Sequence, residues 1–139
     1  MLRDFRSHEK VIGLTCIAPV IAAKIFGNDG VKMTLGGSGD NFPYAGSIGA
    51  ASSFGAEMVE MDVNQVCIDW KNNIITTPAY MQGDASPHAV FDGIQDFLRK
   101  VNSLVRQKEA TMQANKRESS DVQKAKATSE DDLMMRLVM

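Results

Sequence analysis

The feature that most constrains this chain is a short apolar run, residues 11–16 (VIGLTC), that leads directly into a helix-forming segment. The run has no alternation of polar and apolar residues, which is typical of a strand buried on both faces of a parallel sheet. Pro19 follows closely, and proline is favoured in the first turn of a helix, where its missing N–H leaves no bond unmade. The sequence therefore predicts a buried strand, a junction at Cys16, and a helix over residues 19–26 that ends at Gly27.

Strand and helix patterns alternate along most of the chain. Two segments with strand periodicity flank the turn signal Lys71-Asn72-Asn73 and predict an antiparallel hairpin. The hairpin strands are expected at 66–70 and 74–77, further strands at 31–35 and 57–61, and another helix at 44–54. This order indicates an α/β fold in which helices cover a largely parallel sheet.

The last clear element is a helix that runs to about Val105, with Asp84 or Ser86 as its cap and Pro87 in its first turn. Its apolar residues follow the spacing of a core-facing stripe and are Val90, Phe91, Ile94, Phe97, Leu98, Val101 and Leu104. From residue 106 the chain is rich in charge and has no aromatic residue. We therefore expect a domain over 1–105 and a charged tail over 106–139 that is either a helical extension or disordered.

Composition excludes several classes of function. The net charge is −2 and no basic patch is visible, so no nucleic acid or membrane partner is expected. No apolar run approaches the roughly 20 residues that span a bilayer. The glycines at 36, 37 and 39 lack the ending of a phosphate-binding loop, and no His, Cys, Asp or Glu cluster has metal-ligand spacing. We expect no cofactor and no metal.

The residue that carries chemistry is Cys16, at the junction of strand and helix. A sharp turn there would lift the thiol above the sheet edge. The helix N-terminus stabilises negative charge, and the N–H groups near Ile17 and Ala18 could hold an oxyanion. The alternative is that Cys16 is a small buried apolar residue, which is common for free cysteine. Cys67, in the middle of a strand, fits that second description better, and both thiols are expected to be reduced.

Two histidines could assist the thiol. His8 lies in a polar segment, where a solvated side chain is expected. His88 lies in the first turn of the last helix, near the residues ITTPAYM, and is a candidate for a place in the Cys16 pocket.

Several motifs occur in one order along the chain: IGLTCIAPVIAAKIF, PYAG, FGA, ITTPAYM, and a helix that contains DGI. In this combination the chain resembles the PfpI-type, class I glutamine amidotransferase-like superfamily, in its ElbB-like branch, which has mitochondrial members in animals. The resemblance covers residues 1–105 and implies the C-terminal half of a flavodoxin-like sandwich. It also implies Cys16 as the nucleophile at the elbow, a small aldehyde as substrate, and a mitochondrial location, with the cytoplasm as the alternative.

Two departures from the family pattern bear on function. The glutamate that hydrogen-bonds the cysteine in relatives belongs to a segment before Met1, and the stretch VKMTLGG lacks the histidine of many relatives. Leu2 and Phe5 also suggest a helix already under way at the first residue. We therefore expect a truncated or non-catalytic member of this family that can carry a reactive thiol at Cys16. The alternative is a cysteine-dependent glyoxalase or deglycase, active when the N-terminal half completes it. A complementing chain or a second copy is the expected partner, since the elbow strand would otherwise have an open edge.

Overall fold

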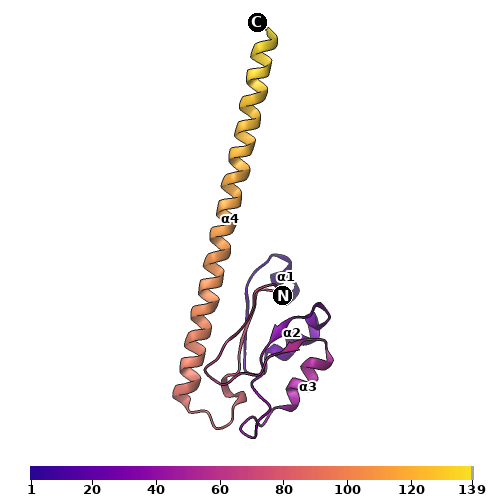
Figure 1. Ribbon diagram of the computed structural model, residues 1–139, viewed down its shortest axis with the longest axis vertical. Helices are drawn as coiled ribbons and strands as arrows, with labels where there is room; N and C mark the ends of the chain where they lie inside the picture. Colours follow the sequence, from indigo (N-terminus) through magenta and orange to yellow (C-terminus); the bar gives the residue numbers. More distant parts are fainter. Residues whose placement is uncertain (139) are drawn as a thin grey trace. The chain divides into compact units, whose positions relative to one another are not determined.

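The computed structural model describes residues 1–138. It divides into two compact units, one over Met1–Val105 and a second that begins at Arg106. The helix α4 (Pro87–Val138) contributes to both units (Figure 1). No helix of the described part is both long enough and apolar enough to cross a membrane.

The main sheet of the first unit has three strands in the order β1-β5-β4. β1 (Ile12–Thr15) pairs in parallel with β5 (Ile74–Thr77), so Thr15 lies opposite Thr77 at the end of the pair. β4 (Cys67–Asp69) pairs with β5 in antiparallel fashion, and this confirms the expected hairpin. β5 is the central strand, and all four of its residues are buried.

A second, two-stranded parallel sheet consists of β2 (Lys32–Met33) and β3 (Glu57–Met58). Both strands are shorter than expected, and no backbone ladder joins them to the main sheet. Side chains make the connection instead. The N–H of Thr34 donates to Oγ1 of Thr76 at 2.9 Å. Because this hydroxyl takes the place of a main-chain acceptor, the expected single sheet is divided into two.

α2 (Pro19–Phe26) and α3 (Gly46–Ser53) pack with the strands around one apolar core. α2 ends at Phe26 with Gly27 as its C-cap, as expected, but Gly27 keeps helical angles and opens a 3₁₀ turn, η1 (Gly27–Asp29), instead of adopting the left-handed conformation of a C′ glycine. The left-handed residue that ends the segment is Gly30, with φ +66°. Gly27 meets a different need: a Cβ there would lie 1.9 Å from the carbonyl oxygen of Phe54.

Within the first unit, the beginning of α4 covers the sheet with residues 87–105. Ser86 caps the helix, since its Oγ accepts the N–H of Ala89 at 3.1 Å. Val90, Phe97 and Leu104 are buried as expected, together with Gly93, whose Cβ would lie 2.2 Å from the carbonyl oxygen of Val63. The glycine of the DGI motif therefore permits a close helix approach.

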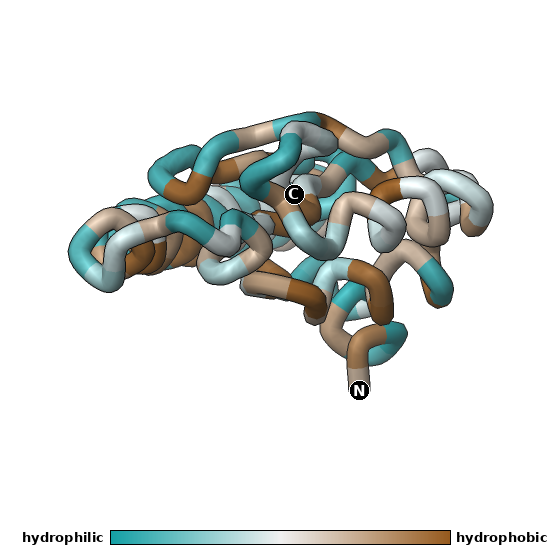
Figure 2. Tube along the Cα trace, turned by 90° about the horizontal axis from the view of Figure 1, so that it is seen from below, coloured by the Kyte–Doolittle hydropathy of each residue, from teal (hydrophilic) through white to brown (hydrophobic). Residues whose placement is uncertain are grey.

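Along the whole trace, apolar stretches are separated by polar ones (Figure 2).

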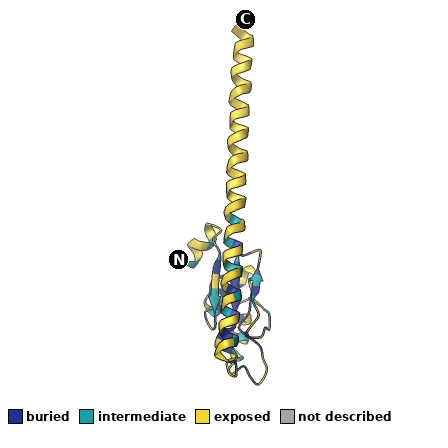
Figure 3. Ribbon diagram, turned by 90° about the vertical axis from the view of Figure 1, so that its left-hand side faces the viewer, coloured by how far each residue is buried: buried dark blue, intermediate teal, exposed yellow. Residues whose placement is uncertain are grey.

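The expectation that Phe91 and Leu98 face the core is wrong, since they are 62% and 58% exposed. They lie one residue beyond Val90 and Phe97, about 100° further round the helix. The stripe that meets the sheet is therefore narrower than the apolar sequence pattern. The helix continues beyond Val105 to Val138, and every side chain from 109 to 138 is exposed (Figure 3).

A buried carboxylate joins the parts of the first unit that lie far apart in sequence. Asp69 is 6% exposed and accepts hydrogen bonds from the N–H of Lys32 at 2.7 Å and from the N–H and side-chain amide of Asn72 at 3.0 and 2.7 Å. Oδ1 of Asn72 in turn accepts a bond from Arg6, on α1 (Leu2–Ser7), at 2.7 Å. Arg6 also pairs with Asp29.

We expect Asp69→Ala to lower the free energy of unfolding by about 2–4 kcal/mol, because it leaves several buried donors without an acceptor. Urea denaturation followed by circular dichroism measures the change. Asp40→Ala, at an exposed site, is the control and should shift stability by less than about 0.5 kcal/mol. Equal effects of the two substitutions would contradict this role for Asp69.

A candidate active-site cysteine at the carboxyl edge of the sheet

Cys16 occupies a tight turn between a strand and a helix. It follows the last residue of β1, and its N–H donates to the carbonyl oxygen of Thr77 at 3.1 Å. Its φ is +59°, in the left-handed region that costs a non-glycine residue about 1–2 kcal/mol. The N–H of Ala18 donates back to Thr15 at 3.1 Å, and α2 begins at Pro19. The strand-to-helix junction expected from the sequence is thus present, with Cys16 at its apex.

The neighbouring strand ends in a similar way. Ala79 begins the short 3₁₀ segment η2 (Ala79–Met81) directly after β5 and Pro78, and its φ is +48°. Two non-glycine residues with left-handed backbone therefore follow the adjacent parallel strands β1 and β5. Such strain concentrates at functional sites. The sequence analysis missed Ala79, because alanine gives no indication of positive φ, although the motif ITTPAYM contains it.

The thiol of Cys16 is half-buried in apolar surroundings. It packs against a cluster formed by Val63, Ala79 and Val90, which come from a loop, η2 and the first turns of α4. Cys16 is thus neither fully buried nor fully exposed.

The second cysteine has a different environment. Cys67 lies inside β4 and is 2% exposed. Burial raises the pKa of its thiol, because a thiolate there would lose its hydration. Cys67 therefore has the character of a structural residue.

The two expected oxyanion donors differ in availability. The N–H of Ala18 already donates to Thr15 within the turn. Ile17 follows the thiol directly, and among the described residues its N–H has no hydrogen-bond acceptor. Of the two expected donors, Ile17 is therefore the one whose N–H is not engaged within the turn.

Neither histidine is hydrogen-bonded to Cys16 in the described part of the chain. Nδ1 of His8 lies 2.7 Å from the carbonyl oxygen of Asp4. His88 is 86% exposed, and its Nε2 lies 3.4 Å from Asp92, one turn along α4. The described contacts of His88 are therefore with its own helix, and its place in the Cys16 pocket has no hydrogen bond to support it.

The glycine-rich loop has a structural explanation. A Cβ at Gly36 or Gly37 would lie 2.7–2.8 Å from the ring of Phe42, so glycine makes room for that ring. The N–H and Oγ of Ser38 donate to the carboxylate of Glu60 at 3.3 and 2.7 Å. The carboxylate of Glu60 therefore occupies the N–H and the hydroxyl of Ser38, which a phosphate bound in this loop could otherwise use.

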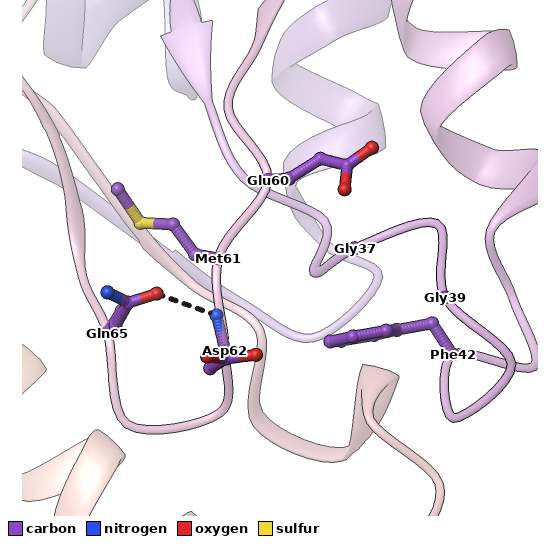
Figure 4. A pocket seen from close by; sticks show the side chains of 7 residues that line it. All are labelled: Gly37, Gly39, Phe42, Glu60, Met61, Asp62 and Gln65. Atoms are coloured by element: carbon purple, nitrogen blue, oxygen red, sulfur yellow. Dashed lines mark hydrogen bonds between the residues drawn. The ribbon is translucent and has the colours of Figure 1, made fainter.

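A small hollow of about 150 Å³ lies beside this loop (Figure 4). Its wall includes the hydrogen bond from the N–H of Asp62 to Oε1 of Gln65 at 2.8 Å. Cys16 is not part of the lining, which is formed by Gly37, Gly39, Phe42, Glu60, Met61, Asp62 and Gln65. Over residues 1–138 no group of three or more His, Cys, Asp or Glu side chains is placed to bind a metal ion.

The left-handed backbone of Cys16 predicts an unusual order of stability. Replacement of alanine by glycine ordinarily lowers the stability of the folded protein. At positive φ, however, glycine avoids the strain that a Cβ creates. We expect Cys16→Gly to be more stable than Cys16→Ala by about 1 kcal/mol. Thermal and urea unfolding of the two variants measure the difference. The ordinary order, with alanine more stable, would show that the turn at Cys16 is not strained.

The raised pKa of Cys67 predicts a loss of stability at alkaline pH. Above the ordinary thiol value of about 8.5 the unfolded chain releases this proton while the folded chain retains it, so unfolding becomes easier as pH rises. The free energy of unfolding, measured from pH 7 to pH 10, should fall more steeply for the unsubstituted chain than for Cys67→Ala. Parallel curves would contradict the assignment.

Comparison with known proteins identifies relatives, although no family model matches the chain. The chain is 40% identical over 107 residues to the human glutamine amidotransferase-like class 1 domain-containing protein 3, mitochondrial. Over the same length it is 39% identical to the rat ES1 protein homolog, mitochondrial, and over 108 residues it is 30% identical to the zebrafish ES1 protein, mitochondrial. The matches cover 73–75% of this chain and 39% of each relative, so the chain spans about two-fifths of their length.

A solved structure supports the same relationship. The crystal structure of an isoprenoid biosynthesis protein with an amidotransferase-like domain from Ehrlichia chaffeensis matches with a TM-score of 0.62 and 25% identity. The match covers 74% of this chain and 45% of that one. With the α/β architecture and the relatives above, it shows that the chain belongs to the glutamine amidotransferase-like superfamily.

Proposed function

We propose that this chain carries the thiol-bearing part of a glutamine amidotransferase-like fold, with a reactive thiol at Cys16 but no catalysis by the chain alone. The observation that carries the proposal is the left-handed turn at Cys16, between β1 and α2 and beside the unoccupied N–H of Ile17. A tight strand-to-helix turn of this kind supports a nucleophile elbow at Cys16, in which the side chain would stand above the carboxyl edge of the sheet.

The chemistry available to Cys16 is addition to a carbonyl group. The thiolate sulfur would bond to the carbonyl carbon of a small aldehyde, and the π electron pair would move to the oxygen. The N–H of Ile17 would hydrogen-bond the resulting oxyanion, and water would then supply the proton that completes a hemithioacetal. This addition is reversible and needs no oxidant, reductant or cofactor.

The surroundings of Cys16 support the non-catalytic part of the proposal. Turnover needs a group that takes and returns protons beside the thiol. The side chains packed on Cys16 come from Val63, Ala79 and Val90 and their apolar neighbours, and His88 is engaged with Asp92. Among the described residues, neither histidine is hydrogen-bonded to Cys16, which supports a chain that lacks the acid–base partner of the thiol.

The second candidate function is a cysteine-dependent enzyme of the glyoxalase or deglycase kind, acting on small aldehydes. The relatives support this second candidate. About three-fifths of their length has no counterpart in this chain, and that part could provide the proton-transferring group. These relatives are mitochondrial by name, which also supports a mitochondrial location for the chain.

The first test is alkylation of the native chain by iodoacetamide, followed by mass spectrometry. We expect Cys16 to be labelled in the folded chain and Cys67 only after urea is added, because Cys67 is 2% exposed. Cys16→Ser should abolish native labelling, and Cys67→Ala should leave it unchanged. Labelling of Cys16 only after unfolding would contradict a reactive thiol.

Incubation with methylglyoxal separates the two candidate functions. A reversible adduct on Cys16 without consumption of the aldehyde supports the non-catalytic proposal. Steady consumption that is lost in Cys16→Ser would show that the chain is itself an enzyme.

A further inference from the structure

The outer face of α4, within the first unit, carries large apolar side chains that the domain does not cover. Phe91 and Leu98 are 62% and 58% exposed. They lie seven residues apart, which places them only about 20° apart round the helix. Gln95 and Asn102 are exposed on the same face, three or four residues away from them (Figure 3). Residues 87–105 of α4 therefore present a narrow apolar stripe to solvent.

A row of charge borders this stripe on one side. Asp92 and Arg99 come one residue after Phe91 and Leu98, so each lies about 100° further round α4, in the same sense. Both are exposed. Asp92 reaches His88 of its own helix at 3.4 Å, and Arg99 makes no ion pair in the described part of the chain. The row therefore has an acid at its N-terminal end and an unpaired base two turns later.

A second copy of this face matches the order of charge when the two helices run antiparallel. In an antiparallel pair related by a two-fold axis, each row of side chains faces the same row of the other helix in reverse order. Asp92 of one copy then lies opposite Arg99 of the other, and the axis repeats the pair. Phe91 lies opposite Leu98 in the same arrangement, with Gln95 at the axis. A parallel pair lacks this match, because each row then faces a different row.

We propose that this face of α4 binds a second copy of the chain. The two helices pair antiparallel through Phe91 and Leu98, with ion pairs between Asp92 and Arg99 at the border. The apolar contact supplies most of the affinity, and the ion pairs set the direction of pairing. Three turns from each helix bury less than the roughly 1,600 Å² of a standard interface, so the dimer should be weak and concentration-dependent.

The first experiment is sedimentation velocity of the full chain carrying Cys16→Ser, over a series of concentrations. Leu98→Ala should raise the Kd of the dimer about tenfold, because the two-fold removes the side chain from both copies. Val122→Ala is the matched control on α4. Val122 is 57% exposed, nearly the same as Leu98, and its truncation should leave the Kd unchanged. Both side chains are exposed, so each variant should fold as the parent does.

A charge exchange tests the ion pairs. Asp92→Arg alone should raise the Kd about tenfold, since it places two positive charges opposite each other twice in the dimer. Arg99→Asp alone should have a similar effect, and the double variant Asp92→Arg/Arg99→Asp should restore the Kd of the parent. Asp121→Arg changes the net charge by the same amount at an exposed site outside the contact, and it should leave the Kd unchanged.

Single cysteines report the direction of pairing. Gln95→Cys should form a disulfide-linked dimer under mild oxidation, because the two copies of this position meet at the axis. Asn102→Cys, seven residues further along the same face, should not. A parallel pair would cross-link at both positions.

The proposal would be overturned by a monomer at every concentration, by equal effects of Leu98→Ala and Val122→Ala, or by a charge exchange that fails to restore the dimer. Cross-linking at both cysteine positions would overturn the antiparallel arrangement. All these measurements use a chain without the Cys16 thiol. The outcome of alkylation at Cys16 therefore leaves this inference intact, and the failure of dimerisation leaves the thiol chemistry intact.

Discussion

The first unit depends above all on β5 and on how its hydrogen bonds are met. All four of its residues are buried, so every main-chain polar group of the strand needs a partner inside the protein. β1 supplies partners on one side and β4 on the other. The hydroxyl of Thr76 additionally accepts the N–H of Thr34, which attaches the second sheet. Burial of one short strand thus determines where three other segments lie.

The geometry around the thiol follows from this central strand. The parallel register of β1 and β5 ends with Thr15 opposite Thr77, so the chain leaves both strands at the same edge. A non-glycine residue with positive φ follows each strand: Cys16 follows β1 and Ala79 follows β5. The N–H of Cys16 donates to the carbonyl oxygen of Thr77, so a hydrogen bond joins the strained turn to β5, the most buried strand of the sheet. The Cys16 side chain is therefore positioned by the backbone of its turn, which is itself hydrogen-bonded to β5.

Much of this arrangement could be predicted from local sequence patterns. The run VIGLTC, the proline that opens α2 and the hairpin were predictable because periodicity and turn chemistry act over a few residues. What could not be predicted depends on contacts between distant segments. Gly27 has no room for a Cβ because the carbonyl oxygen of Phe54 lies close to it, and Leu98 is exposed because the sheet contacts only a narrow stripe of α4. Likewise, the N–H of Ala18 is consumed by its own turn, so one of the two expected oxyanion donors is unavailable.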